Sequence, residues 1–569
     1  MSTDRSSLNP QRRGEALRRM GERTFDIVVV GGGITGVGTA LDAVSRGLSV
    51  ALLEAGDLAV GTSSRSGKVF HGGLRYLEQL NFSLVREALK ERDLMVDRLC
   101  PHLVSPELFL FPFTRRWERP YVGSGVLLYD LLRLTGTRSV KGHRHLTRSR
   151  VLREMPALRP EQITGGVQYY DVRVDDARHT MTVARTAAQL GAEIITRARV
   201  VGVLREGGRV SGVRVHDLES EDEVTVRARV VANATGVWAE DVQALAGDRT
   251  ISVTAAKGIH LVVPKDRIDS RTGLIAKTHD SVFIVRRWFD YWLMGTTDTQ
   301  WDHERDDPAA TKADVDYLLG HANRWLRTPL GYDDIVGVYA GLRPLVSGRG
   351  NTTAALSRDH SVVEGPHGMV TVVGGKYTTY RIMARDAVDA ATRQLGREVP
   401  ASATERLPVL GAVGYSALHN QRVSLATESG LDERWIDHLL GRYGALTLEI
   451  LDLIADQPSL GQPVIGAPGY LAAELHYAAA HEGALHLDDV LVRRTHIFME
   501  TPDHGVAAAP HAAAVVADAL GWDDVRRKEE VERFRVEREA DRRAAVARTD
   551  ADAVTARHAT RLETTRKHL

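Results

Sequence analysis

The stretch FDIVVVGGGITGVGTALDAVSRGLSVALLEAGD, residues 25–57, constrains the fold of this chain most strongly. β-Favouring residues run from Ile27 to Val30 and end in a cluster of glycines. A helix-like segment follows, and a second apolar run, 50–53, ends at an acidic residue. A strand, a glycine turn, a helix, a strand and an acid in this order predict part of a parallel sheet that holds a nucleotide.

Three glycines of the turn, Gly31, Gly33 and Gly36, have the spacing G-x-G-x-x-G. This spacing allows a tight turn, lets the backbone approach a pyrophosphate, and packs the helix against the strand. Glu54 lies about 20 residues further on, where a carboxylate accepts hydrogen bonds from an adenosine ribose, which argues against NADP. The unit predicts dinucleotide binding but does not by itself distinguish FAD from NAD.

The composition excludes several classes of protein. The chain has 569 residues, which predicts two or three domains, and its formal net charge is +0, so no overall field indicates a nucleic-acid partner. We find no uncharged apolar run long enough to cross a bilayer and expect no integral membrane segment. Residues 1–24 contain Arg12-Arg13 without a following signal-like apolar stretch, so we expect a flexible or short helical arm.

Cysteine and histidine give no metal site. Cys100 is the only cysteine, so no disulfide forms within the chain, and we expect it to be a small core residue. His143 and His145 form an H-x-H pair, but we expect them to lie in an arginine-rich loop without acidic partners. We therefore predict no metal.

Further motifs follow the nucleotide unit in a fixed order. They are GTSSRSGKVFHGGLRYLE, VDDAR, NATGVW, KGIHLVVP, MGTTD, GLRPL and VGGKYTTYR. Together they resemble the FAD-dependent glycerol-3-phosphate dehydrogenase family of the D-amino-acid-oxidase-like flavoproteins. The resemblance is dense over residues 25–400 and thinner beyond, where DDVLVRRT (488–495) is similar to the family's C-terminal signature.

The resemblance implies an α/β (α+β) fold, in which a Rossmann-like FAD-binding domain is interleaved with a β-rich substrate domain and followed by a C-terminal helical cap. Residues 195–238, with Gly207-Gly208 at the first turn, are typical of the β-meander in such proteins. The expected segments are an arm (1–24), the FAD-binding domain (25–80, 160–250, 340–400), the substrate domain (81–159, 251–339), the cap (405–520) and a charged tail (521–569) of mostly solvated helix or disorder.

The family binds FAD non-covalently, and the resemblance implies which residues face the cofactor. The glycines would let the backbone approach it, and the short hydroxyl side chains would hydrogen-bond it. These residues are Gly31, Gly33, Gly36, Glu54, Thr62, Ser63, Ser64, Lys68, His71, Gly236, Gly374, Gly375 and Lys376.

The implied substrate is glycerol 3-phosphate, whose dianionic phosphate requires cations. Matching positions place Arg75, Arg343 and Lys376 at this phosphate, with Tyr76 and Thr297 beside the pocket. Arg381 is a further candidate, with the alternative that it only pairs with a carboxylate. Asp175, Asp176 and Arg178 are interpreted as positional residues.

The reaction requires a base for the C2 hydroxyl proton. His260 is the candidate because an imidazole titrates near working pH, and the alternative is a strand histidine that only hydrogen-bonds the flavin or substrate. Arg343 would stabilise the alkoxide-like transition state. Asp298 would orient His260 or a basic residue.

The family passes the electrons to a quinone or, in its oxidase branch, to oxygen. A non-catalytic flavin-binding redox sensor is the alternative from another class. A quinone-linked enzyme without a spanning helix must contact the bilayer surface, and the candidates are residues 121–136, unless they pack in the core, and the Arg-rich tail. We expect a cytoplasmic protein, peripheral on the inner face of the plasma membrane; a homodimer is left open.

Overall fold

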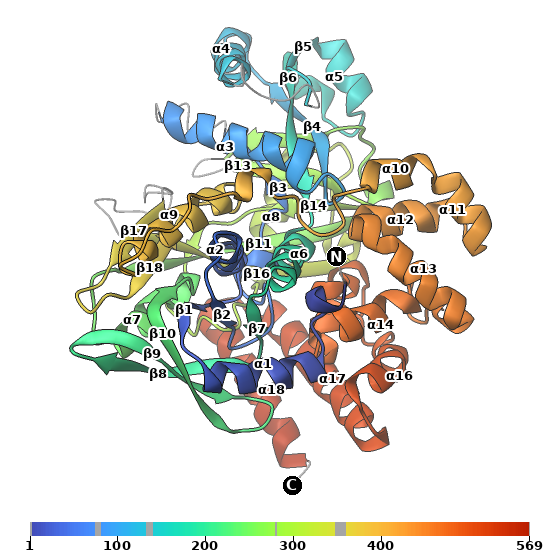
Figure 1. Cartoon of the computed structure of the whole chain (residues 1–569). Helices are drawn as coiled ribbons and strands as arrows, with labels where there is room; N and C mark the ends of the chain where they lie inside the picture. Colours follow the sequence, from blue (N-terminus) through green and yellow to red (C-terminus); the bar gives the residue numbers. More distant parts are fainter. Residues whose placement is uncertain (1–2, 74–80, 133–139, 279–281, 347–359, 568–569) are drawn as a thin grey trace.

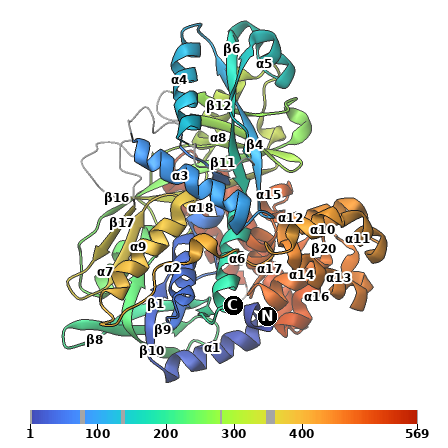
Figure 2. The same ribbon diagram turned by 45° about the horizontal axis from the view of Figure 1, so that its top comes forward.

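A computed structural model describes residues 3–73, 81–132, 140–278, 282–346 and 360–567. It contains two large sheets and a helical C-terminal region, which confirms the predicted α/β architecture (Figure 1). In Figures 1 and 2 the C-terminal region, coloured orange to red, lies along one side of the molecule. Among the described residues, no helix is both long enough and apolar enough to cross a bilayer.

The first sheet has eight strands in the order β17-β18-β10-β1-β2-β7, with β9 and β8 continuing from β10. The pairs around β1 are parallel, as the βαβ sequence pattern predicts. The strands are β1 (Phe25–Val30), β2 (Val50–Leu53), β7 (Glu193–Ile195), β8 (Ala198–Glu206), β9 (Arg209–Asp217), β10 (Glu223–Asn233), β17 (His360–Glu364) and β18 (Val370–Gly374).

Alternate side chains of β1 enter different cores. Ile27 and Val29 pack with α2 (Ile34–Ser45), α6 (Asp176–Gln189) and α9 (Tyr380–Thr392). Val28 and Val30 pack with the meander and with α1 (Pro10–Glu22) of the N-terminal arm. The sheet is therefore buried on both faces around β1 and β2, which is why residues 27–30 and 50–53 are continuously apolar.

The second sheet has ten strands in the order β15-β11-β14-β13-β12-β4-β6-β3, with β16 paired to β11 and β5 to β6. Helices α5 (Arg148–Glu154) and α8 (Lys312–Trp325) contribute to the core on it. Its strands are β3 (Val69–Phe70), β4 (Val104–Phe113), β5 (Arg144–Thr147), β6 (Gly165–Val174), β11 (Val253–Pro264), β12 (Gly273–Lys277), β13 (Val282–Trp288), β14 (Tyr291–Gly295), β15 (Thr299–Gln300) and β16 (Gly337–Val346).

The pairing of β6 and β16 differs from the expected division of the chain. β6, and β16 from residue 340 onward, lie in segments assigned above to the FAD-binding domain, yet these strands pair with β4 and β11 of the second sheet. The apolar pattern of β6 and β16 predicts that they are strands. It does not predict which sheet each strand joins, because their pairing partners are distant in the sequence.

The C-terminal region is helical, with one short hairpin, β19 (Pro463–Val464) and β20 (Ala467–Leu471). The tail differs from the solvated or disordered segment expected, because its two helices pack together and bury Phe534 and Ala544. The helices are α10 (Tyr415–Asn420), α11 (Arg422–Ser429), α12 (Glu433–Tyr443), α13 (Thr447–Asp456), α14 (Ala472–His481), α15 (Ile497–Glu500), α16 (Ala509–Leu520), α17 (Asp524–Ala545) and α18 (Asp550–Lys567).

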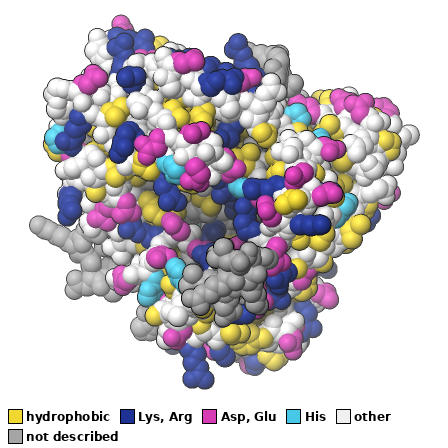
Figure 3. Space-filling view, turned by 90° about the horizontal axis from the view of Figure 1, so that it is seen from below, with side chains coloured by type: hydrophobic (Ala, Val, Ile, Leu, Met, Phe, Trp, Pro, Cys, Tyr) yellow, Lys and Arg dark blue, Asp and Glu magenta, His cyan; other side chains and the backbone are white. Residues whose placement is uncertain are grey.

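Three helices complete the two domains: α3 (Phe82–Leu94), α4 (Glu118–Leu131) and α7 (Ala239–Leu245). On the face shown in Figure 3, basic and acidic side chains are interspersed, in keeping with the net charge of +0.

Candidate active site

The glycine turn between β1 and α2 depends on the absence of side chains. Gly31 has φ 109°, and a Cβ on Gly36 would lie 1.9 Å from the carbonyl oxygen of Gly31. Gly33 is the N-cap of α2. The strand and the helix therefore approach closely, with the positive end of the helix directed at the turn.

Glu54 follows β2 and closes this turn. Its carboxylate accepts hydrogen bonds of 2.6 Å from the backbone amides of Gly32 and Gly56. Burial raises the pKa of Glu54, while the two amide donors act in the opposite direction. The carboxylate thus lies beside the glycine turn, where the sequence predicts the ribose contact.

The loop after the nucleotide unit connects the two sheets. Thr62 Oγ1 donates to the carbonyl oxygen of Leu342 in β16 at 2.5 Å, and Ser63 Oγ accepts from the amide of Ile34 in α2 at 2.9 Å. The hydroxyl groups predicted to bind the cofactor therefore also fix the loop between α2 and the second sheet.

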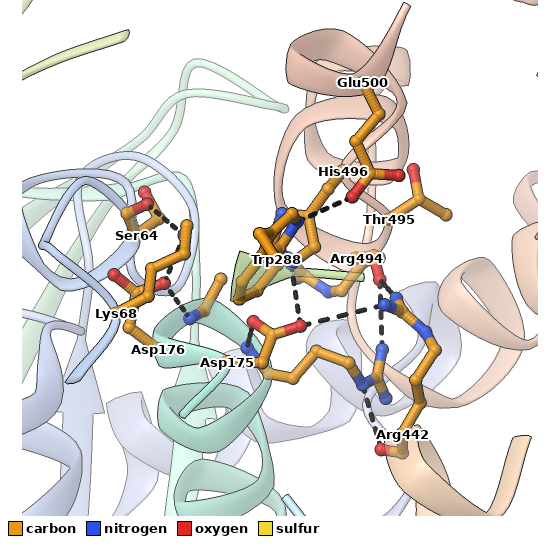
Figure 4. Close-up of polar contacts among 12 residues, drawn as sticks. Ser64, Lys68, Asp175, Asp176, Trp288, Arg442, Arg494, Thr495, His496 and Glu500 are labelled. Atoms are coloured by element: carbon orange, nitrogen blue, oxygen red, sulfur yellow. Dashed lines mark hydrogen bonds and ion pairs between the residues drawn. The ribbon is translucent and has the colours of Figure 1, made fainter. Parts of the chain in front are cut away.

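Lys68 ends this loop as a buried cation. Its Nζ lies 2.6 Å from Asp176 Oδ1 and 3.0 Å from the carbonyl oxygen of Ser64 (Figure 4). His71 lies two residues past Val69, and its amide donates to Thr378 Oγ1 at 3.2 Å. Lys68 thus connects the loop, through the carbonyl oxygen of Ser64, to Asp176 at the N-terminus of α6.

Three predicted glycines have positive φ angles: 60° at Gly236, 71° at Gly374 and 79° at Gly375. A Cβ on Gly375 would lie 2.5 Å from Met383 Sδ. Lys376 is the N-cap of a short 3-10 turn, Tyr377–Thr379, that leads into α9. The N-terminal end of this turn and of α9 therefore lies next to Lys376.

His260 and Arg343 lie on neighbouring strands. His260 of β11 pairs in register with Tyr339 of β16, and the two rings stack with centroids 4.9 Å apart. A Cβ on Gly295 would lie 2.2 Å from His260 Cδ2, and one on Gly258 would lie 2.2 Å from Arg343 Nη2. The two glycines therefore make room for the imidazole and the guanidinium.

Asp298 orients Arg343. Arg343 Nη1 lies 3.2 Å from Asp298 Oδ1, and Nη2 donates to Thr296 Oγ1 at 2.8 Å. The carbonyl oxygen of Thr297 accepts a further bond at 3.1 Å, while its Oγ1 accepts from the amide of Ile259. Asp298 was expected to orient either His260 or a basic residue, and the contact described here is with a basic residue, Arg343.

The environment of His260 favours the neutral imidazole. Burial is the largest cause, and the nearby Arg343, Lys68 and Arg286 add to it, lowering the pKa of His260 to about 3. Near neutral pH the ring therefore carries no charge and has a lone pair with which to accept a proton. The expectation that this imidazole titrates near working pH is wrong for the protein without substrate, because burial and the three cations lower its pKa.

Arg381 has a partner of its own. Its Nε and Nη2 lie 2.8 and 2.6 Å from the two carboxylate oxygens of Glu91, and both side chains are buried. This is the carboxylate pairing considered as the alternative to substrate binding. Arg75 and Tyr76 lie outside the described residues.

Two residues at the site had no role in the sequence-based assignment. Tyr339 stacks on His260, and its hydroxyl donates to the carbonyl oxygen of Ser66 at 3.0 Å. Gly258 provides the space for Arg343. Asp175, interpreted as positional, caps α6 and lies 2.7 Å from His496 Nε2, as Figure 4 shows.

Within the described part of the chain, no group of three potential ligands could hold a metal ion. One detail of the sequence analysis is wrong: His143 does have an acidic partner, since its Nδ1 lies 2.7 Å from Asp130 Oδ2. Asp130 lies on α4, and His143 immediately precedes β5, so the two residues meet only through the tertiary fold. Cys100 is buried, as expected.

The site fits a dinucleotide. The turn at Gly31 and Gly36 brings bare backbone against the N-terminus of α2, which suits a pyrophosphate, and Glu54 lies beside it for a ribose. The loop of Thr62 and Ser63 then leads to the strands that carry the imidazole and the guanidinium.

Comparison with known protein families gives two matches. Residues 26–381 match the model described as FAD dependent oxidoreductase. Residues 402–527 match the C-terminal domain of alpha-glycerophosphate oxidase.

Similar proteins are found among curated sequences and solved structures. The chain is 54% identical over 519 residues to glycerol-3-phosphate dehydrogenase 2 of Mycobacterium bovis, covering 91% of this chain and 88% of that protein. It is 32% identical over 549 residues to the human mitochondrial glycerol-3-phosphate dehydrogenase, covering 92% and 75%. The structure of the glycerol-3-phosphate dehydrogenase from Bacillus halodurans complexed with FAD superposes with a TM-score of 0.77 at 26% identity, covering 93% of this chain and 98% of that one.

Proposed function

This chain belongs to the FAD-dependent oxidoreductase family, and on that premise we propose that it oxidises sn-glycerol 3-phosphate to dihydroxyacetone phosphate and passes the electrons to a quinone. The names of its relatives, which are glycerol-3-phosphate dehydrogenases from bacteria and mammals, support the substrate and the reaction. FAD is the cofactor of the family, and we propose that it is held non-covalently.

One observation carries the proposal. The loop that follows the nucleotide unit runs beside His260 and Arg343 of the second sheet. A Cβ on Gly67 would lie 3.5 Å from His260 Nε2, and the backbone of Arg65 approaches Gly341, two residues before Arg343. A cofactor that follows this loop reaches a neutral imidazole, His260, and a cation, Arg343. That combination suits the oxidation of an alcohol that carries an anionic group.

When bound, FAD supplies the acceptor for the hydride from C2 of the substrate. We assign His260 to take the proton of the C2 hydroxyl, since its imidazole is neutral near pH 7 and lies on β11 at the pocket. A dianionic substrate would offset the repulsion from nearby cations and raise the pKa of His260 toward the working range.

Arg343, held by Asp298, is assigned to the substrate's developing negative charge. Lys376 is assigned to the phosphate, together with Arg75 and Tyr76 of the segment outside the described residues. Thr297 positions the strand that carries His260. Arg381 is assigned to fold stability through Glu91.

The membrane would be contacted through α4. Trp117, Tyr121, Leu127 and Leu131, which we call the α4 surface, are 57, 51, 50 and 47% exposed. Arg115, Arg116 and Arg119 are exposed beside them. Aromatic and aliphatic side chains next to arginines are typical of a helix that lies in the interface of an anionic membrane. Of the two regions considered, this one is favoured over the tail, whose helices pack against the protein.

The deciding experiment is anaerobic. FAD-loaded protein is mixed with glycerol 3-phosphate, and the absorbance of the oxidised flavin at about 450 nm should disappear. A quinone analogue should then restore it faster than air does. A yellow protein that glycerol 3-phosphate does not bleach would refute the substrate and revive the redox-sensor alternative. Rapid reoxidation by oxygen with release of hydrogen peroxide would favour an oxidase.

A further inference from the structure

A cavity of about 390 Å³ lies between the N-terminal arm, the C-terminal end of α6 and β7. None of the residues assigned above to the nucleotide or the substrate lines it. Among the described residues that line it, five are arginines and a single one, Glu193, is acidic. The arginines are Arg5, Arg12, Arg13, Arg19 and Arg23.

Two of these arginines hold the cavity open in a fixed shape. Arg13 lies 2.5 Å from Asp217 and also donates to the carbonyl oxygen of Thr196 at 2.9 Å. Arg19 lies 2.7 Å from Glu193. These contacts fix α1 against β7, Thr196 and the end of β9, so little ordering is required when a ligand enters.

The remaining wall combines cations with apolar surface. Arg5, Arg12 and Arg23 add guanidinium groups, a type of side chain that can bind phosphate in a bidentate manner. Arg23 Nη2 also lies 3.5 Å from Glu193 Oε1, so Arg19 and Arg23 share that carboxylate. The apolar part is contributed by Leu8, Ala16, Ala188, Ile194 and Leu485. The volume lies within the range of small-molecule sites, about 300–1,000 Å³, and exceeds the needs of a bare phosphate.

We propose that this cavity, the arm site, binds a phosphate monoester that carries a small apolar group. The guanidinium groups take the dianionic phosphate, and the apolar wall takes the organic part. The adjacent Arg12 and Arg13 of the N-terminal arm both line this site.

The phosphate could belong to a free metabolite or to a lipid headgroup. In Figures 1 and 2, α1 lies at the opposite end of the molecule from α4. A flat bilayer that contacts the α4 surface would therefore not reach the arm site, which favours a free ligand.

The test is calorimetric titration of FAD-loaded protein with inorganic phosphate and with phenyl phosphate. All variants carry Lys376→Ala, so that the phosphate contact assigned above to the substrate site is removed. The parent should bind phenyl phosphate more tightly than inorganic phosphate. Arg5→Ala/Arg12→Ala should weaken phenyl phosphate about tenfold, as loss of charged hydrogen bonds does. Arg18→Ala, an exposed arginine of the same helix outside the cavity lining, should bind as the parent does.

Arg23→Ala serves as the second variant and should weaken phenyl phosphate in the same direction. Unchanged binding in both variants would overturn the proposal, whether or not the protein oxidises glycerol 3-phosphate. Sedimentation with vesicles of phosphatidic acid and phosphatidylcholine distinguishes the two sources. A loss of vesicle binding in Arg5→Ala/Arg12→Ala would identify a headgroup, and unchanged vesicle binding a free ligand.

Discussion

Lys68 Nζ lies 2.6 Å from Asp176 Oδ1, and both side chains are buried. The pair joins the loop that follows the nucleotide unit to the N-terminus of α6. Next to it, Asp175 caps the same helix and contacts His496 of the C-terminal region (Figure 4). One helix terminus therefore connects the cofactor loop to the cap.

Breaking this pair should destabilise the protein. Asp176→Asn would leave the Lys68 cation buried without its counter-charge, and removing one partner of a buried pair lowers the free energy of unfolding by about 3–5 kcal/mol. Urea unfolding followed by circular dichroism measures this loss. Lys312→Ala removes the exposed Lys312–Asp316 pair and should leave the urea midpoint nearly unchanged. Equal midpoints for the two variants would contradict the role of Asp176.

Arg343→Ala should leave FAD binding intact and remove most activity. Loss of a charged contact to the transition state costs on the order of 2–3 kcal/mol, or about a hundredfold in kcat/KM. The measurements are the flavin content of the purified variant and its steady-state kinetics. Arg324→Ala on α8, an exposed arginine of the same domain, should behave as wild type. Normal turnover by Arg343→Ala would show that the site is misplaced.

Gly258→Ala tests the site with a single methyl group. The new Cβ would lie 2.2 Å from Arg343 Nη2 and 2.6 Å from Thr296 Oγ1, so the guanidinium must shift. We expect kcat/KM to fall at least about tenfold, which corresponds to about 1.4 kcal/mol, while the flavin spectrum stays the same. Gly320→Ala in α8, where a Cβ would meet nothing within 4 Å, is the matched control and should keep full activity. If the two variants are equally active, Arg343 is not confined as described.

His260 should make stability depend on pH. Its pKa is lowered to about 3 in the folded protein from an ordinary value of 6.5, so the unfolded chain binds more protons between these values. The free energy of unfolding should therefore decrease as the pH is lowered from about 6.5 to about 3, by about 1.4 kcal/mol per pH unit for this group. His260→Gln removes the contribution, while other buried histidines such as His102 still titrate. Urea midpoints at about pH 7.5 and 5.5 should thus differ less in His260→Gln than in wild type; equal differences would refute a buried neutral His260.

The α4 surface should bind anionic vesicles. Trp117→Ser/Tyr121→Ser removes two exposed aromatic rings and should lower the fraction that sediments with phosphatidylglycerol vesicles several-fold, because each buried ring contributes about 2 kcal/mol or more. Val413→Ser in the cap removes an apolar side chain that is 75% exposed and is the control. If the aromatic variant sediments as wild type does, another surface contacts the membrane.

Local patterns account for the elements that carry the site. The G-x-G-x-x-G turn required a strand before it and a helix after it, and β1 and α2 occupy those positions. Gly207 and Gly208 predicted the first hairpin turn, and both have positive φ angles in the β8–β9 turn. His260, Arg343 and Lys376 were placed by motif, and each lies on or directly after a strand.

Contacts between segments that are distant in the chain could not be predicted from the sequence. β6 and β16 show apolar patterns that fit either sheet, and only pairing with β4 and β11 decides which. Arg381 was open between substrate and carboxylate until Glu91 of α3 proved to lie beside it.

The sequence by itself determined the nucleotide unit, because backbone approach to a pyrophosphate depends on glycines at fixed spacing within one short segment. The tertiary structure alone decided the charge state of His260 and the orientation of Arg343. The pKa of His260 is lowered by burial and by Arg343, which is 83 residues away, and Asp298 and Gly258 orient that arginine from two other segments. Such electrostatic and steric effects depend on distances in space, which no local pattern encodes.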